Sequence, residues 1–424
     1  MGSLSDSVRI LVEPSEYSRL TNVGDMAMQH TTITRLAALW PSSDIRVFAD
    51  DPANLPAYAP NVRGINTSGR AAWIAGCVPA LRRRLPLTYP LRAALASAER
   101  ALVLRAPSFA RKDVAAFHEA VTESDALVVC GMGGVTDAFP AFTAALLDVI
   151  ALAKANGGLV AMFGQGIGPL ERNTQLWSHA AAVLPHVDLI ALREGRISAA
   201  LLDAMNVPRD RVVVTGDDAI AVALAAGAHG PRDALGVNVR IAHYADVGSE
   251  LLPPLRDAVQ AFARSRGAPL MAAPSDLHPQ SGDGQPTEAL LAGFGHVRPS
   301  RIDDPESFGR AVSGCRVLLT GSYHAGVFAL AQGVPIVGLE RSAYYRDKWA
   351  GLLHQFGSGV HPVSLRASDW RDRLHEALTL AWDTADEVRD ALRAAAERQA
   401  RESRAAYERF GVLMNARVVQ RSHA

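Results

Sequence analysis

Cysteine, net charge and long apolar runs are all scarce in this chain of 424 residues. Its three cysteines, Cys77, Cys130 and Cys315, are far apart and odd in number, which argues against a disulfide framework and against a zinc site. Basic residues number 43 and acidic residues also 43, so the net charge is zero. The overall charge therefore predicts neither nucleic acid nor an anionic membrane as a partner.

No apolar stretch approaches the roughly 20 residues that a membrane-spanning helix needs. Residues 1–7 also lack the basic and apolar regions of a signal peptide. These two features predict a soluble, cytoplasmic protein.

Short apolar runs alternate with helical stretches along most of the chain, a pattern typical of parallel sheets joined by crossover helices. The runs are 8–12, 45–48, 126–129, 159–163, 189–192 and 212–214, and then 235–239, 269–272, 317–320 and 335–339. The stretch 225–233 is rich in Gly and Ala and contains Pro231, which marks a boundary. We predict two Rossmann-like α/β domains, 1–228 and 229–369, followed by C-terminal helices over 370–424.

A basic helical insertion is predicted from about residue 71 to residue 112, within the first domain. It contains the run Arg82-Arg83-Arg84 and four further arginines. The simpler interpretation is a solvated surface, and the alternative is peripheral contact with an anionic acceptor or with lipid headgroups.

Polar and glycine-rich segments follow the strands of the first series, at the ends where such folds place ligands. Asn22, Gly24 and Asp25 follow the first strand, where Asp25 can cap the next helix or meet a ligand. The turn at 131–134, which contains Gly133 and Gly134, can present N–H groups to an anion or simply join a strand to a helix. Asp137 follows that turn.

Two further strands of this series also end in polar residues. The segment 164–169, with Gln165 inside it, predicts a rigid loop because glycines alternate before a proline. Arg193 can hold a carboxylate or phosphate, or it can pair with Glu194. Asp217 can bind a sugar hydroxyl or cap a helix, and no metal site is predicted there.

In the second domain, the segment Ser322-Tyr323-His324 follows the strand at 317–320 and opens a helix. A bound phosphate would favour the protonated ring of His324, which makes His324 a candidate proton donor. Three cations, Arg240, Arg341 and Lys348, lie after neighbouring strands.

In this order the segments resemble those of polysaccharide pyruvyl transferases, from about Val8 to Gly357. The matching motifs are Asn22-x-Gly24-Asp25, the turn 131–134, Gly164–Pro169, Arg193-Glu194-x-x-x-Ser198, Thr215-Gly216-Asp217, Gly236-Val237-Asn238-x-Arg240, His324-Ala325, Gly333-Val334-Pro335 and Lys348. The resemblance implies a GT-B-like architecture, with two Rossmann-like domains whose parallel sheets face a central cleft. It also implies transfer of the pyruvyl group of phosphoenolpyruvate to two hydroxyls of one sugar as a cyclic ketal. Phosphoenolpyruvate is then a co-substrate, no cofactor is expected, and the acceptor is a carbohydrate or a glycosylated small molecule.

The resemblance also implies roles for individual residues. His324 is the candidate general acid, and Asp25 is assigned to the acceptor hydroxyl. The remaining site residues are donor-binding Arg193, Lys348, Ser322, Arg240, Arg341, Gly133 and Gly134, and acceptor-binding Asn22, Asp137, Gln165 and Asp217.

One position departs from the family, because Ser322 stands where the family has an arginine two residues before the histidine. A charge-assisted bond to the donor is worth about 1.5–3 kcal/mol. Either Arg240, Arg341 or Arg346 compensates for its loss, or the donor differs.

Two alternatives remain open at this stage. The first is a GT-B glycosyltransferase that uses a nucleotide-sugar, with Glu340 reaching the ribose. The second is a non-catalytic binding protein of the same fold.

Overall fold

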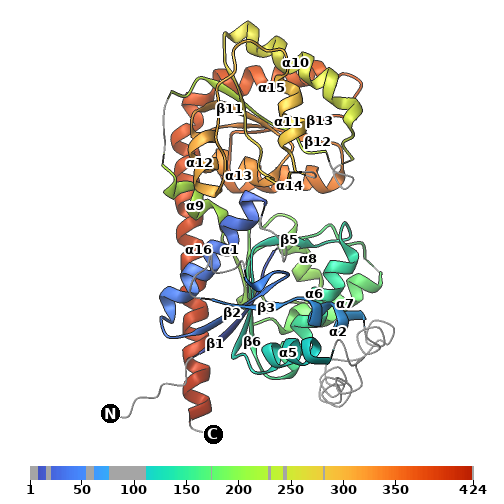
Figure 1. Ribbon diagram of the computed structural model, residues 1–424, viewed down its shortest axis with the longest axis vertical. Helices are drawn as coiled ribbons and strands as arrows, with labels where there is room; N and C mark the ends of the chain where they lie inside the picture. The colour runs from blue at the N-terminus through green and yellow to red at the C-terminus, as the bar shows by residue number, and fades with distance from the viewer. Residues whose placement is uncertain are drawn as a thin grey trace. The chain divides into compact units, whose positions relative to one another are not determined.

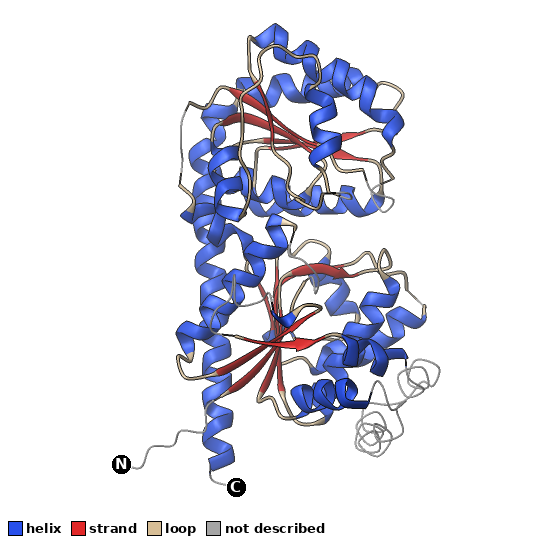
Figure 2. Cartoon of the chain, viewed as in Figure 1, coloured by secondary structure: helices blue, strands red, loops and turns tan. Residues whose placement is uncertain are grey.

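The structure, a computed structural model, describes residues 8–15, 21–53, 62–75, 111–172, 174–227, 231–241, 246–279 and 282–422. The chain forms two compact units, each built on one sheet with helices around it (Figure 2). Unit 1 comprises Met1–Leu20, Met28–Thr215 and Glu402–Ala424, and unit 2 comprises Thr21–Ala27 and Gly216–Arg401.

The sheet of unit 1 has eight strands, and all of its pairings are parallel. In spatial order the strands are β3 (Arg63–Asn66), β2 (Asp44–Ala49), β1 (Arg9–Glu13), β4 (Ala126–Val129), β6 (Leu159–Ile167), β7 (Leu189–Leu192) and β8 (Val212–Val214), and β5 (Met132–Val135) pairs with the end of β6. The sequence predicts all of these except β3 and β5. Edge strand β3, with the sequence Arg-Gly-Ile-Asn, has no apolar run to reveal it.

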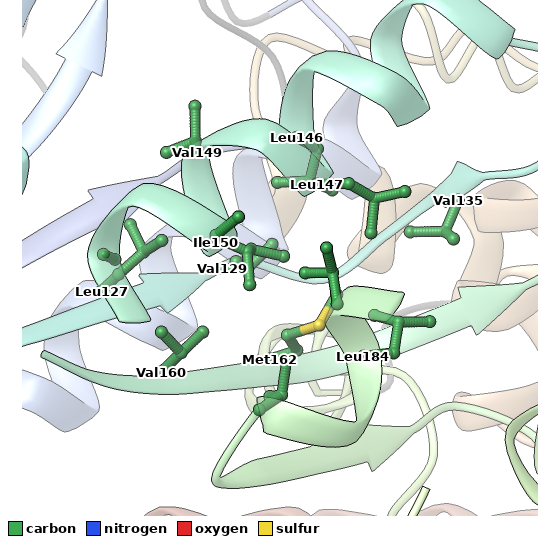
Figure 3. Packing of buried hydrophobic residues seen from close by; sticks show 14 of the residues in the cluster. Leu127, Val129, Val135, Leu146, Leu147, Val149, Ile150, Val160, Met162 and Leu184 are labelled. Atoms are coloured by element: carbon green, nitrogen blue, oxygen red, sulfur yellow. The ribbon is translucent and has the colours of Figure 1, made fainter. Parts of the chain in front are cut away.

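Side chains alternate between the two faces of this sheet, and both faces are buried. On one face, Leu127 and Val129 of β4 pack against helix α6 (Pro140–Ala155), which contributes Leu147 and Ile150 (Figure 3). Helices α2 (Ser68–Ala75), α5 (Arg111–Thr122), α7 (Gln175–Val183) and α8 (Ser198–Ala204) also belong to unit 1 (Figure 1). Burial on both faces explains why the strands read as continuous apolar runs.

The opposite face is covered by α1 (Val23–Leu39) and by the last part of α16 (Ala385–Ser422). Tyr407 of α16 stacks on Phe163 of β6, with 3.7 Å between the ring centroids. The predicted C-terminal segment 370–424 is therefore not a separate layer. Its last residues, from Glu402 on, complete the core of unit 1.

A buried hydroxyl pair tests this role of α16. The hydroxyl groups of Tyr407 and Thr32 lie 2.9 Å apart. Replacement of Tyr407 by Phe is expected to lower the free energy of unfolding of unit 1 by about 1–2 kcal/mol, because the Thr32 hydroxyl loses its partner. Urea unfolding would measure this loss. Adding Thr32→Val to Tyr407→Phe should cost little more, and an unchanged stability of Tyr407→Phe would contradict the integral role of α16.

The sheet of unit 2 is also entirely parallel. Its order is β10 (Leu270–Ala272), β9 (Ala234–Asn238), β11 (Cys315–Thr320), β12 (Ile336–Glu340) and β13 (Val360–Ser364). The remaining helices are α9 (Ala219–Ala225), α10 (Leu252–Arg266), α11 (Gly284–Leu291), α12 (Pro305–Ser313), α13 (Tyr323–Ala331), α14 (Ala343–Phe356) and α15 (Trp370–Asp383). Helices α10, α11 and α15 share one core with the sheet. Strand β13 was not predicted, because His361 and Pro362 interrupt its apolar pattern.

The compact units differ from the predicted domains in two ways. The chain enters unit 2 at Gly216, whereas the predicted boundary followed residue 228, because α9 packs on α12 and α13 of unit 2. Residues Thr21–Ala27 also belong to unit 2, although they come early in the sequence.

The basic insertion predicted at 71–112 is described only at its two ends, by α2 and α5. Residues 76–110, which include Arg82-Arg83-Arg84, lie outside the described residues. In the described part of the chain, every helix is too short or too polar to span a bilayer.

Candidate active site

The segment Thr21–Ala27 is held against unit 2 by backbone pairing. Asn22 forms an antiparallel bridge with Asp276, and the N–H of Val23 donates to the carbonyl of Ser275 at 2.9 Å. These bonds bring together residues that are far apart in the sequence.

Helix α1 begins beside this bridge, and Asn22 caps it. The Asn22 Oδ1 accepts from the N–H of Gly24 at 2.9 Å and of Asp25 at 3.4 Å. Of the two interpretations of Asp25, the helix cap is therefore wrong, because the side chain three residues earlier is already in the capping position. The Asp25 carboxylate has no hydrogen-bond or ion-pair partner among the described residues.

His324 lies in the first turn of α13, as predicted, with its ring against Gly24. A Cβ atom added at Gly24 would lie 2.0 Å from the Cγ of His324, so only glycine fits here. On another side of the ring, the His324 Nε2 lies 3.7 Å from the Asp217 Oδ2. The structure thus gathers Gly24, Asp217 and His324, with Asp25 adjacent to Gly24.

Ser322, at the start of α13, belongs to a buried polar network. The Ser275 hydroxyl lies 2.8 Å both from the Asp283 carboxylate and from the Ser322 hydroxyl. Since a hydroxyl has one proton, Ser275 donates to only one of these two acceptors at a time. Ser322 makes no side-chain cap bond to its own helix. It contributes a neutral hydroxyl where an arginine would contribute a charge.

Asp283 is the buried carboxylate of this network and is only 1% exposed. Burial raises its pKa, and hydrogen bonds from the Asp276 N–H, Asn238 and Ser275 oppose that rise, as does the charge of Arg240. The polar segment 275–285 therefore contains buried, hydrogen-bonded residues on both sides of the undescribed residues 280–281.

The predicted cations of unit 2 lie in three different settings. Arg240 pairs with Asp276 at 2.9 Å, and Arg341 pairs with Glu250 at 3.2 Å. The Lys348 Nζ lies over three aromatic rings, at 4.0 Å from the centroid of Tyr344, 5.1 Å from Tyr345 and 5.4 Å from Tyr323. The three rings place the Lys348 ammonium beside the first turn of α13 by cation–π attraction.

Glycine-rich segments of unit 1 differ from their predicted form. Residues 164–167 continue strand β6 and are not a loop. Gly133 and Gly134 lie in β5, and α6 begins only at Pro140, so this turn does not open a helix. These glycine-rich residues are strand residues because β5 pairs with the end of β6, and a pattern of isolated glycines does not reveal that pairing.

Arg193 is buried and lies over Gly166 of β6. A Cβ atom at Gly166 would lie 2.5 Å from the Arg193 Nε, so the glycine makes room for the guanidinium. Glu194 holds the start of α8 through its side chain. Its carboxylate accepts from the N–H groups of Ile197 and Ser198 at the start of α8.

Two predicted acceptor residues of unit 1 hold the protein's own backbone. Gln165 is fully buried and donates to the carbonyls of Cys130 at 2.6 Å and Phe163 at 2.8 Å. The Asp137 carboxylate accepts from the N–H of Glu171. Their predicted contacts with an acceptor remain predictions.

A buried ion pair of unit 1 was missed from the sequence. Glu13, at the end of β1, accepts from Arg70 of α2 at 2.7 Å, and the two side chains are 0% and 9% exposed. The only sequence signal is a carboxylate that directly follows an apolar strand. Its partner is 57 positions away, so local patterns could not pair them.

Comparison with known proteins connects this geometry to a family. Residues 22–342 match the family described as Polysaccharide pyruvyl transferase. No curated protein sequence matches the chain significantly.

Solved structures show the fold. A putative UDP-N-acetylglucosamine 2-epimerase from Listeria monocytogenes has a TM-score of 0.59 at 13% identity, covering 98% of this chain and 97% of that one. A UDP-GlcNAc 2-epimerase from Neisseria meningitidis, bound to UDP-GlcNAc, has a TM-score of 0.55 at 12% identity, covering 97% and 100%. A glycosyltransferase from Rickettsia africae has a TM-score of 0.55 at 9% identity, covering 96% and 99%. The predicted GT-B-like α/β fold is thereby confirmed.

Proposed function

Because this chain belongs to the polysaccharide pyruvyl transferase family, we propose that it transfers the pyruvyl group of phosphoenolpyruvate to a sugar acceptor. The product is a cyclic ketal on two hydroxyls of one sugar, and phosphate leaves. The observation that carries this proposal is the position of His324, in the first helical turn after β11, between Gly24 and Asp217.

His324 acts as the general acid in this proposal. It gives a proton to the methylene carbon of phosphoenolpyruvate, which becomes a methyl group and leaves an oxocarbenium-like centre at the neighbouring carbon. Asp25, whose carboxylate has no partner among the described residues, accepts the proton of the first attacking hydroxyl. The second hydroxyl displaces phosphate. Of the two hydroxyl protons, one balances the proton on the new methyl group and the other leaves with phosphate.

Lys348 supplies the charge that Ser322 does not. Its ammonium is held beside α13 by three tyrosine rings, and an ammonium is a point charge suited to a phosphate or carboxylate. Arg193 of unit 1 remains the second predicted donor-binding cation. No cofactor takes part in this proposed reaction.

Thermal unfolding with candidate donors tests this proposal. Saturating phosphoenolpyruvate is expected to raise the Tm by about 2 °C or more. Inorganic phosphate at the same concentration should raise it less, because it lacks the carboxylate. Lys348→Met should abolish the shift, whereas Lys112→Met removes the same charge from an exposed position of α5 and should preserve it.

A nucleotide-sugar glycosyltransferase is the second candidate, favoured by Ser322, which puts a neutral side chain at the start of α13. Glu340, at the end of β12, is the acid that would reach a ribose, and burial raises its pKa. Stabilisation by UDP and not by phosphoenolpyruvate would establish this candidate and refute pyruvyl transfer.

A further inference from the structure

Asp217 lies directly before helix α9, and its two carboxylate oxygens have different surroundings. Oδ1 accepts from the N–H of Ala219 at 2.9 Å. Oδ2 lies 3.7 Å from His324 Nε2, and the two side chains are 1% and 12% exposed. One oxygen is therefore fixed by the backbone while the other is directed at the imidazole.

Two helices that run side by side set this distance. Helix α9 packs along α13, and the Gln332 side chain, just after α13, donates to the carbonyl of Ala223 near the end of α9. This bond ties the helices together near their C-terminal ends, and the 3.7 Å between Asp217 and His324 shows that their N-terminal ends also lie together. The arrangement belongs to the framework of unit 2 and not to a single loop.

Gly24 limits the ring of His324 from another direction. The Cα of Gly24 approaches so closely that an added Cβ would lie 2.1 Å from the His324 Nδ1. The ring therefore has little room to turn away from Asp217.

We infer that Asp217 is the positioning residue of His324, holding the ring in place with a buried carboxylate beside its Nε2. The inference rests on the proposed role of His324 as general acid, and it replaces the predicted role of Asp217 in binding the acceptor. The charge of a carboxylate at this distance acts more strongly on a neighbouring ring when the carboxylate is buried than when it is exposed. His324 would then be ready to give its proton to the donor.

Other charged groups of unit 2 surround the start of α13 and must be considered. Asp218 follows Asp217, and Asp25 follows Gly24 in the segment Thr21–Ala27. Two cationic residues also lie near the start of α13. The ammonium of Lys348, in α14, lies over the ring of Tyr323, and the backbone N of Arg240 lies 3.3 Å from a Cβ position built at Gly321. All four groups remain when Asp217 alone is neutralised, so their influence is constant in the comparison below.

The test is Asp217→Asn, which keeps an oxygen for the Ala219 N–H and removes only the charge. The rate of carbethoxylation of His324 by diethyl pyrocarbonate, followed by peptide mass spectrometry from pH 5 to pH 9, reports the unprotonated ring in the resting protein. The midpoint of this reaction is expected to move to lower pH by about one unit. The high-pH limb of the pH profile of kcat/KM should also move to lower pH by about one unit.

Three further variants make the outcome specific. Asp217→Glu keeps the negative charge, so its midpoint should lie closer to that of the unsubstituted protein than the midpoint of Asp217→Asn does. Asp217→Ser, which can also accept from Ala219, repeats the test if Asn impairs folding. Asp304→Asn is the matched control, because Asp304 caps α12 in the same unit and Asn caps equally well. It should leave the midpoint unchanged.

The two hypotheses fail separately in this experiment. An unshifted midpoint in folded Asp217→Asn and Asp217→Ser would refute the pairing, whatever the substrate is. A shifted midpoint in a protein that does not use phosphoenolpyruvate would refute the proposed reaction and support the pairing.

Discussion

Replacement of His324 by Gln is expected to lower kcat for phosphoenolpyruvate-dependent transfer by about 10²–10⁴-fold, the usual contribution of a general acid. Glutamine keeps a polar side chain of similar reach but cannot give up a proton at neutral pH. Binding of phosphoenolpyruvate should be nearly unchanged, because the donor charges are met by other residues. Phosphate release in the presence of a diol-bearing sugar acceptor measures kcat, and the donor-induced Tm shift measures binding.

His354→Gln is the matched control for this substitution. His354 lies in α14 of the same unit but is exposed. It should retain full activity. If His324→Gln kept more than about a tenth of kcat, protonation by His324 could not be the step that the family resemblance implies.

Gly24→Ala is expected to lower kcat by about 10²-fold, the usual result of moving a catalytic group by about 1 Å. The added Cβ would lie 2.0 Å from the His324 Cγ, so either the imidazole ring or the segment Thr21–Ala27 must move. Gly24 lies in the first turn of α1, where alanine is a better helix former, so the loss should not come from the helix itself. Steady-state kinetics together with a thermal melt would separate lost activity from lost stability.

Two comparisons make the Gly24 result interpretable. Gly284→Ala is the matched control, because a Cβ at this helical glycine of unit 2 meets nothing within 4 Å. In a His324→Gln background, Gly24→Ala should cost much less activity, since coupled residues are not additive. Full additivity of the two substitutions would show that Gly24 acts elsewhere than on His324.

Most of the central strands and the position of His324 could be predicted from the sequence. Strand β4 is buried on both faces, and its four residues are apolar without alternation, which is why it was predicted with its observed bounds. His324 was placed in a first helical turn because an apolar strand, a short polar turn and a helical stretch follow one another there. Such signals depend only on neighbours in the sequence.

The predictions that failed concern residues whose state depends on distant partners. Asn22 and Asp25 are both residue types that cap helices. The bond from the Val23 N–H to the Ser275 carbonyl fixes where α1 begins, and this makes Asn22 the cap. The glycines of 164–167 suggested a loop, but pairing with β5 and β7 draws them into β6.

The sequence by itself determined the fold class, the family resemblance and the residue types needed for acid–base chemistry, because burial pattern and turn chemistry are local properties. The tertiary structure alone decided which residues meet. Gly24 and Asp217 are far from His324 along the chain, and they reach it through backbone pairing with the segment at 275–277 and through the packing of α9 on α13. Contacts of this kind depend on how whole elements pack, and no sequence window contains both partners.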